Sequence, residues 1–376
     1  MNICLLTDKY PPDPGGVAIS AGRLAQGLAA AGHTVHVCGP SNALLIGQSE
    51  SSAGPSGVTV HRFGAARRAE DTYAEWFDHV VALHESHPFD VLHGYYLAGA
   101  GFVAAYAGRY LNRPSIASGR GNDVDRAIFA PEKAAHTLWT LANASAITAV
   151  SHQLAGKIAA LGRPARVIHN AVDSAIFAPR PAAPLDPYGL RTDGLPVIGF
   201  VGEARRKKGL YTLLMAGVQL AAERPIKLAL IGGVRADDAA ALEVFEDQRP
   251  PNLHISVIPH LNHADLPDLY ALLDVLALPS LRDGLPNALL EGMACARPII
   301  TTRTGGILDA VTDGVEAVLI APNDANALME AIRALLDDPA RWIALGQAAR
   351  RRALTDFTPE REIAANVQLY AELTCR

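Results

Sequence analysis

The chain has 376 residues, of which 49% are hydrophobic and 19% charged, and its formal net charge is −5 at pH 7. This length exceeds what one hydrophobic core usually serves, so we expect two domains of similar size. The composition excludes an intrinsically disordered chain, and the net negative charge argues against nucleic acid as a general partner.

The four cysteines are scattered along the chain, and no CxxC spacing or Cys/His cluster occurs. Neither a disulfide framework nor a zinc site is therefore indicated. The opening MNICLL runs straight into a polar turn and is too short for a signal peptide, and no apolar run approaches the roughly 20 residues that span a bilayer. We expect a cytoplasmic protein. Arg62, Arg67 and Arg68 are candidates for a peripheral contact with a phospholipid-linked acceptor or with the inner membrane face.

The chain begins with a strand–loop–helix–strand pattern. NICLL predicts a short buried strand, and a turn-rich loop, YPPDPGG, follows it. Leu24 and Leu28 keep helical spacing in the next segment, and Gly32 suits the left-handed residue that ends a helix. Thr34–Cys38 then predicts a strand. This order is the βαβ unit of a doubly wound sheet.

The same alternation continues to a proline-rich segment and restarts after it. In the first half, we predict further strands at Asp90–His93, Ser115–Ser118, Ala146–Val150 and Arg166–His169. The segment Ala178–Pro187 lacks periodicity and is interpreted as a linker. In the second half, strands are predicted at Val197–Val201, Lys227–Ile231, His254–Val257, Val275–Leu278, Pro298–Thr301 and Ala317–Ile320.

The predicted fold class is therefore α/β, with two Rossmann-like doubly wound domains facing a central cleft. We place the first domain at residues 1–180 and the second at 190–355, with a C-terminal helix in 358–376 that packs back on the first domain. Ligands bind at the carboxyl ends of strands in such sheets, so strand ends from both domains are expected to face the cleft.

A run of four cations, Arg205 to Lys208, follows a predicted strand and opens a helix. A helix N-terminus already carries partial positive charge, so cations there are unfavourable unless an anion joins them. A diphosphate would remove the conflict, whereas a solvated basic loop is the alternative for an isolated charge run. The position at a strand end favours phosphate.

Two acids flank the start of a short apolar helix in RDGLPNALLEGMA. Pro286 fits the first helical position, which makes Leu285 the N-cap and leaves Asp283 too early to cap the helix. Glu291 lies about one and a half turns inside the helix. Either Glu291 is a buried acid paired with a cation, or both acids accept hydrogen bonds from the vicinal hydroxyls of a sugar or a ribose.

These motifs together resemble the retaining glycosyltransferases of the GT-B fold, the group 1 or glycogen-synthase-like family. The segment PSLRDGLPNALLEGMACARPII resembles the family's E-x7-E stretch. PPDPGGVA, GHTV, RGNDVD, AVSHQL, VIHNAVDSAIFAP and FVGEARRKKGL resemble its other landmarks and occur in the same order. The resemblance covers nearly the whole chain.

The resemblance implies roles for individual residues. Glu291 would bind the ribose hydroxyls of a nucleotide sugar, Asp283 would contact the transferred sugar, and Lys208, with Arg205, would clamp the diphosphate. The remaining donor-binding positions are Gly15, Gly16, Gly202, Gly284, Leu285, Pro286, Asn287 and Leu290, and Arg120 and Asp123 stand in the loop expected to face the acceptor.

The chain departs from the family pattern at several positions. Asp283 replaces a glutamate, and Glu203 stands where the family has an arginine whose role Arg205, two residues on, is expected to take. Arg120 replaces a frequent histidine, and Asp309 stands where the family carries Glu.

The resemblance implies an enzyme that transfers a sugar with retention from a nucleoside diphosphate, with UDP first and GDP second. The expected acceptor is a glycan, a lipid-linked sugar or a small molecule in polysaccharide or glycoconjugate synthesis. No metal or other cofactor is expected, since no Asp-x-Asp motif occurs in a matching place. Other interpretations stay open: a degenerate transferase that only binds nucleotide sugar, an epimerase or phosphorylase of the same architecture, and a bilobed sugar-binding protein. The sequence leaves the acceptor, the sugar and the oligomeric state undecided.

Overall fold

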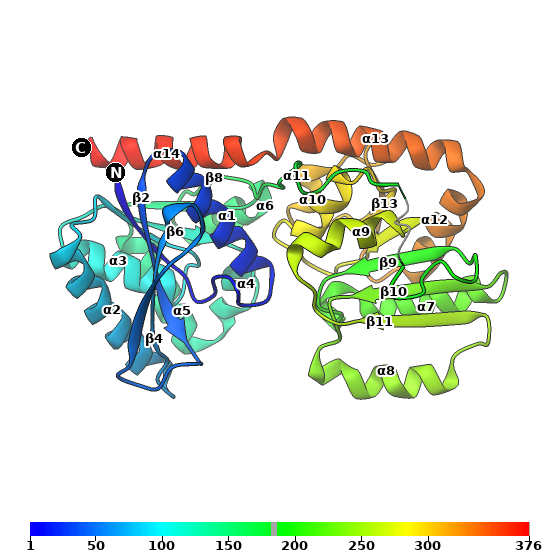
Figure 1. Cartoon of the computed structure of the whole chain (residues 1–376), viewed down its shortest axis with the longest axis horizontal. Coiled ribbons are helices and arrows are strands. Elements are labelled where there is room, and N and C mark those ends of the chain that lie inside the picture. Colours follow the sequence, from blue (N-terminus) through cyan, green and yellow to red (C-terminus); the bar gives the residue numbers. More distant parts are fainter. Residues whose placement is uncertain (182–185, 376) are drawn as a thin grey trace. The chain divides into compact units, whose positions relative to one another are not determined.

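The computed structural model describes residues 1–181 and 186–375, which form two compact units. Unit 1 comprises Met1–Asn170 and the segment from Pro359 onward, and unit 2 comprises Ala171–Thr358. Figure 1 shows both units along the chain. Of the predicted linker Ala178–Pro187, residues 182–185 lie outside the described residues, as does residue 376 of the predicted C-terminal segment.

The change between units falls earlier in the chain than the predicted domain end at residue 180. Its physical reason is the packing of the segment after Asn170, because Phe177 is fully buried and its ring lies 4.8 Å from that of His263 in unit 2. The backbone N–H of Val172 also donates to the carbonyl of Phe357 at 2.9 Å. These contacts place the start of the proline-rich segment in unit 2.

Unit 1 is built on an eight-stranded sheet with the order β3-β4-β2-β1-β5-β6-β7-β8, in which only β3 runs antiparallel to its neighbour among the described pairs. The strands are β1 Asn2–Leu6, β2 Thr34–Ser41, β3 Ser49–Ala53, β4 Thr59–Gly64, β5 Val91–Gly94, β6 Ser115–Gly119, β7 Ala146–Ala149 and β8 Arg166–Val167. The helices are α1 Gly16–Ala30, α2 Ala69–Ser86, α3 Ala100–Tyr110, α4 Asn122–Asp125, α5 Pro131–Asn143, α6 His152–Ala160 and α14 Pro359–Thr374, with short 3-10 turns η1 Pro55–Gly57 and η2 Ala127–Phe129.

The alternation of side chains along β1 assigns the helices to the two faces of this sheet. Ile3 and Leu5 pack in one cluster with side chains of α1 and α14, and Cys4 and Leu6 pack in another with α2 and α3. Helix α14, the last element of the chain, therefore completes one face of unit 1, where it lies along α1 (Figure 1).

Unit 2 is built on a six-stranded parallel sheet with the order β11-β10-β9-β12-β13-β14. The strands are β9 Val197–Val201, β10 Ile226–Ile231, β11 Leu253–Ile258, β12 Val275–Leu278, β13 Ile299–Thr302 and β14 Val318–Ile320. The helices are α7 Leu210–Ala221, α8 Ala236–Gln248, α9 Leu266–Ala271, α10 Asn287–Ala294, α11 Ile307–Ala310, α12 Ala325–Asp337 and α13 Pro339–Asp356, with turns η3 Arg206–Lys208 and η4 His263–Asp265.

The sheet of unit 2 is covered on both faces, as a doubly wound fold requires. Ile198 and Phe200 share a cluster with side chains of α7 and α12, while Gly199 between them approaches Leu273 after α9. Most predicted strands are confirmed within one or two residues of their ends; β2 runs on to Ser41 and β8 is only Arg166–Val167. In neither described part of the chain, 1–181 or 186–375, does any helix combine the length and hydrophobicity needed to cross a bilayer.

Candidate active site

Three loops of unit 2 meet because the strands that precede them are neighbours. β9, β12 and β13 lie side by side and run parallel, so their carboxyl ends share one edge of the sheet. The loop after β9 carries the cation run, the loop after β12 carries Asp283, and the loop after β13 carries Gly305 and Gly306. Sheet order thus brings together motifs that lie far apart in the sequence.

Lys208 and Asp283 form an ion pair where the first two loops meet. The ammonium of Lys208 lies 2.5 Å from Oδ2 of Asp283, and Oδ1 accepts the backbone N–H of Gly284 at 3.0 Å. Burial raises the pKa of Asp283, but the Lys208 and Lys207 charges and the Gly284 N–H together lower it below its usual value. Asp283 is therefore ionised at neutral pH and holds a cation at the sheet edge.

Glycines allow the loops to approach this closely. Gly209 has φ +83° and Gly305 has φ +59°, which are left-handed conformations that favour glycine. A Cβ at Gly305 would collide with the carbonyl oxygen of Asp283, and the backbone N–H of Gly306 donates to the carbonyl of Gly284 at 2.5 Å. The backbone position of Asp283 is thus fixed by the loop after β13.

Glu291 is buried in α10, with 7% of its side chain exposed, and both of its carboxylate oxygens have partners. Oε1 lies 2.9 Å from Nε2 of His263, and Oε2 accepts the hydroxyl of Tyr270 at 2.9 Å. Burial, and then the charge of Glu291, raise the pKa of Tyr270 well above its usual value, so its hydroxyl stays protonated. The sequence did not predict His263 or Tyr270 as partners, since nothing in their spacing from Glu291 indicates the contact.

Arg205 lies in the same loop as Lys208 but points to another partner. Its guanidinium lies 3.0 Å from a carboxylate oxygen of Glu203, and Arg235 lies 3.8 Å from the same oxygen. Glu203 stands where the family has an arginine. It thus forms an ion pair with Arg205, the residue expected to take over the role of that arginine. A diphosphate-binding role for Arg205 stays a prediction.

The tip of α10 differs in one detail from the prediction. The helix begins at Asn287 with Pro286 as N-cap, because Pro286 has an extended ψ of 133° and not a helical one. Pro286 makes no side-chain capping hydrogen bond, and Gly284, Leu285 and Pro286 are buried. Leu290 has no exposed surface, so its side chain packs in the core, and its donor-binding role stays a prediction.

The remaining predicted glycines also stand at strand-to-helix turns. Gly202 follows β9 with φ +124°, and a Cβ there would meet nothing within 4 Å. In unit 1, Gly15 has φ +112° at the N-cap of α1, and Gly16 is the first residue of that helix. Gly202 and Gly15 share a positive φ, which favours glycine.

In unit 1, Asp123 is engaged within its own loop, whereas the side chain of Arg120 contacts other segments of the unit. Asp123 is 1% exposed and accepts backbone N–H groups of Gly121 at 2.7 Å and of Arg120 at 2.9 Å. The guanidinium of Arg120 lies 4.2 Å from the ring centre of Tyr95 and donates to Asn170 at 2.5 Å. Asp123 therefore shapes the loop, and an acceptor role for Arg120 or Asp123 stays a prediction.

Burial bears on one other sequence-based suggestion, the membrane contact of Arg62. Arg62 lies in strand β4, and its guanidinium donates to the carbonyl of Tyr10 at 2.7 Å and pairs with Asp13 at 3.1 Å. With only 10% of its side chain exposed, Arg62 is not placed to bind a membrane, so that suggestion is wrong for this residue. Trp76 is fully buried, which makes it a packing anchor of α2.

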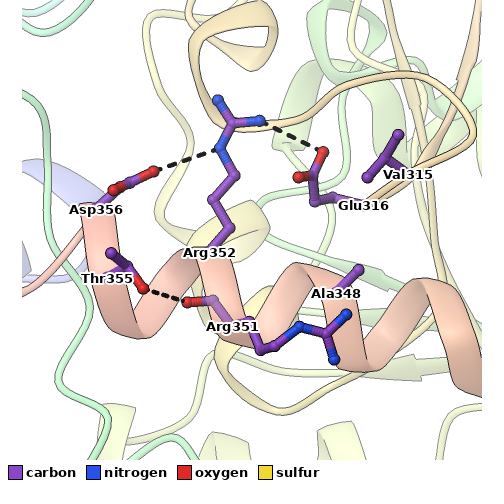
Figure 2. A pocket seen from close by; sticks show the side chains of 7 residues that line it. All are labelled: Val315, Glu316, Ala348, Arg351, Arg352, Thr355 and Asp356. Atoms are coloured by element: carbon purple, nitrogen blue, oxygen red, sulfur yellow. Dashed lines mark hydrogen bonds and ion pairs between the residues drawn. The ribbon is translucent and has the colours of Figure 1, made fainter.

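A hollow of about 430 Å³ lies elsewhere in unit 2, beside α13 (Figure 2). Arg352 crosses it, with Glu316 at 3.3 Å and Asp356 at 3.7 Å, and donates to the carbonyl of Asp309 at 3.0 Å. The positive charge of Arg352 is neutralised by these two carboxylates, and its contacts join the segment after α11 to helix α13. Asp309, at the family's Glu position, contributes its backbone to this arrangement.

Two family models match the chain, one described as glycosyl transferases group 1 over residues 195–338 and one as glycosyltransferase family 4 over residues 14–176. The chain belongs to the group 1 glycosyltransferases. Sucrose-phosphate synthase from Thermosynechococcus elongatus has the same fold, with a TM-score of 0.83, 21% identity, and coverage of 100% of this chain and 99% of that one. The Anabaena protein HepE, solved in complex with UDP-glucose, has a TM-score of 0.79 and 18% identity, over 99% of this chain and 100% of that one.

A curated relative within the family is the 2-deoxystreptamine glucosyltransferase of Streptomyces kanamyceticus. It is 31% identical over 230 residues, which cover 58% of this chain and 58% of the relative. The alignment thus spans little more than half of that enzyme. The glycosyltransferase family matches, and not the fold alone, favour a transferase over an epimerase or a phosphorylase of the same architecture.

Proposed function

We propose that this group 1 glycosyltransferase moves a sugar, with retention of anomeric configuration, from a nucleoside-diphosphate sugar to a hydroxyl acceptor. The observation that carries the proposal is the Lys208–Asp283 ion pair at the meeting point of three loops, next to the tip of α10. UDP is the favoured nucleotide and GDP the second, by family resemblance. The HepE complex supports UDP as the first nucleotide to test.

The diphosphate is expected to bind at Lys208 and the tip of α10. A helix N-terminus offers N–H groups and partial positive charge, and Lys208 adds a full charge whose position is fixed by Asp283. A fixed cation stabilises the negative charge that develops on the leaving phosphate without reorganising during the reaction. A Cβ at Gly202 would meet nothing within 4 Å, so this turn leaves room for the phosphates, whereas Gly209 lets its loop pass close to the carbonyl of Pro279.

The ribose is expected to bind at Glu291. Each carboxylate oxygen has two lone-pair positions, and His263 and Tyr270 use one on each oxygen. One position on each oxygen is left for a vicinal diol. Asp283, whose Oδ2 faces Lys208, would contact the transferred sugar.

Retention is assigned to attack on the face from which the phosphate departs. The acceptor oxygen forms its bond to the anomeric carbon, the bond to the diphosphate oxygen breaks, and the departing phosphate takes the acceptor's proton. Lys208 stabilises the phosphate through this step and needs no metal ion to do so. We accordingly propose that the reaction is independent of divalent cations; activity abolished by EDTA and restored by Mg²⁺ would contradict this.

The assignment is tested by Lys208→Ala and Glu291→Ala, assayed for sugar transfer and for donor hydrolysis with UDP-glucose and GDP-mannose. Transfer should fall by about 100-fold or more, since each change removes a charged contact in a site shielded from water. Arg333→Ala is a control, because Arg333 also forms an ion pair, with Glu223 at 3.1 Å, but on the surface of unit 2. Unchanged transfer in either site variant, with unfolding temperatures near that of the unsubstituted protein, would refute the site.

A second candidate function, a nucleotide-sugar-binding protein without transfer, is favoured by one observation. Glu203 places a negative charge 3.0 Å from Arg205, in the loop that should bind a diphosphate. Such a protein would bind UDP-sugars and neither transfer nor hydrolyse them. The hydrolysis assay separates the two functions.

The acceptor is proposed to be a glycan, a lipid-linked sugar or a small molecule, bound in unit 1. Arg67 and Arg68 are exposed before α2 and are the remaining candidates for a peripheral membrane contact in a cytoplasmic enzyme. Vesicles of anionic lipid that fail to retain the protein in flotation would end that proposal.

A further inference from the structure

The carboxylate of Glu291 is held by two side chains from a segment that the family motifs do not include. His263 opens the turn η4 after strand β11, and Tyr270 follows in α9. Their donors reach different oxygens of the same carboxylate, each at 2.9 Å. Because the two oxygens are fixed separately, the plane of the carboxylate cannot rotate without breaking one of the two contacts.

The two partners are themselves braced by one buried ring. Phe177 is fully buried. The centroid of its ring lies 4.8 Å from that of the His263 ring and 6.1 Å from that of the Tyr270 ring. Tyr270 is fully buried, whereas 28% of the His263 side chain is exposed. His263 is thus the outer partner of Glu291, and Tyr270 the inner one.

The donor and acceptor roles follow from chemistry. An ionised carboxylate only accepts hydrogen bonds, so Nε2 of His263 carries the hydrogen and donates it to Oε1. A hydrogen bond to a charged group holds its partner more firmly than one between neutral groups. With one lone-pair position per oxygen still open, the carboxylate presents two acceptors in one fixed plane, which matches two adjacent hydroxyls.

We propose that His263 is a positioning residue that gives this protein its preference for a ribonucleotide, by fixing the carboxylate of Glu291 so that each oxygen receives one ribose hydroxyl. The inference rests on the proposed donor site and adds to it the residue that orients the ribose-binding acid. Tyr270 assists from the buried side. Neither residue contacts the reacting centre, so their effect is on nucleotide affinity and not on the rate of transfer once the donor is bound.

The test measures binding of a nucleoside diphosphate and of its 2′-deoxy form by calorimetry. Whichever of UDP, GDP and ADP binds most tightly is compared with dUDP, dGDP or dADP. The unsubstituted protein should prefer the ribonucleotide by about tenfold or more, since one hydrogen bond to a charged group is lost in the deoxy form. In His263→Ala, this ratio should fall to about one third of its original value or less, because the freed carboxylate can turn toward a single hydroxyl.

His263→Gln supplies the decisive comparison. The glutamine amide can place an N–H donor near the position of Nε2, so the preference for the ribonucleotide should return to within about twofold of the original ratio. In transfer assays, His263→Ala should raise KM for the donor and leave kcat within about threefold. His254→Ala, an exposed histidine of β11, is the matched control and should change none of these quantities.

The outcomes are distinguishable. An unchanged ratio in His263→Ala, with nucleotide binding intact, overturns the role of His263 and leaves the donor site standing. A ratio that falls equally in His263→Ala and His263→Gln also overturns it, since the donor is then not what matters. If the unsubstituted protein binds none of the three nucleotides, the proposed function and the inference fail together.

Discussion

One buried histidine of unit 1, His93, makes the stability of this protein depend on pH in a way that can be calculated. Its Nδ1 lies 2.7 Å from the hydroxyl of Tyr370 in α14, and its Nε2 lies 2.7 Å from the hydroxyl of Ser118 in β6. Only 1% of His93 is exposed. Burial, and then the nearby charge of Arg120, lower the pKa of His93 from 6.5 to about 3.

The sign and size follow from proton linkage. The unfolded chain takes up a proton at His93 below about pH 6.5, whereas the folded chain does so only near pH 3. The free energy of unfolding therefore falls as the pH drops below 6.5, by up to about 1.4 kcal/mol per pH unit, and continues to fall until about pH 3. Between pH 7.5 and pH 5.0, the loss due to this one residue is about 2 kcal/mol.

The measurement is urea unfolding at pH 7.5 and pH 5.0 for the unsubstituted protein and for His93→Gln, followed by tryptophan fluorescence. Two of the three tryptophans, Trp76 and Trp139, lie in unit 1 and report on it. His93→Gln should be less stable at pH 7.5, because it disturbs two buried hydrogen bonds. Its disadvantage should shrink by about 2 kcal/mol at pH 5.0.

Other buried histidines, such as His36 with a pKa lowered to about 4, titrate in both proteins, so their contribution cancels in the difference. His254→Gln, at an exposed position, should follow the unsubstituted protein at both values of pH. A difference between the unsubstituted protein and His93→Gln that stays the same at pH 7.5 and pH 5.0 would refute the reasoning.

Two further predictions concern the loops of unit 2. Gly305→Ala should weaken UDP binding by about tenfold or more, because the added Cβ would displace the carbonyl of Asp283. Gly314 is the control, since it is also left-handed but a Cβ there would meet nothing within 4 Å. Gly314→Ala should lower the free energy of unfolding by about 1–2 kcal/mol through backbone strain and leave UDP binding unchanged. Equal binding by the two variants in calorimetry would contradict this. Glu203→Ala should tighten UDP binding by about two- to tenfold at low salt and by less at 1 M salt, since it frees Arg205 and removes an opposing charge; a weaker or unchanged affinity would show that Arg205 does not reach the phosphates.

The architecture could be predicted from the sequence because buried parallel strands are short apolar runs. Val197–Val201 and Val275–Leu278, for example, are observed with the predicted bounds. The edge strand β3, SESSA, could not be predicted, since all of its residues are exposed and none carries a strand signal. Strand β4 was not predicted either; within it, Arg62 donates to the backbone carbonyls of Pro40 and Tyr10.

For the candidate site, the sequence indicates residues whose roles stay predictions, and it does not indicate their contacts. The spacing of Asp283 and Glu291 around a helix start indicated a ligand for both acids, and the cation run indicated an anion. The partners of these residues come from other loops: His263 approaches Glu291 through the fold of β11 and α9, and Glu203 turns back on Arg205. Local sequence carries no information on such pairs, because they depend on which strands are neighbours.

The arrangement of neighbouring strands also explains how the positive charge of Lys208 is balanced in this structure. Lys208 is balanced by Asp283, which belongs to the next strand of the sheet and follows it by 75 positions. The carbonyl of Asp283 is in turn fixed by Gly305, which follows the strand after that. If β9, β12 and β13 were separated by another strand, roughly 5 Å of added spacing would break both contacts. The order of strands in the sheet is therefore itself a condition for the charge pair, and a permuted sheet with identical loops would leave Lys208 without its carboxylate.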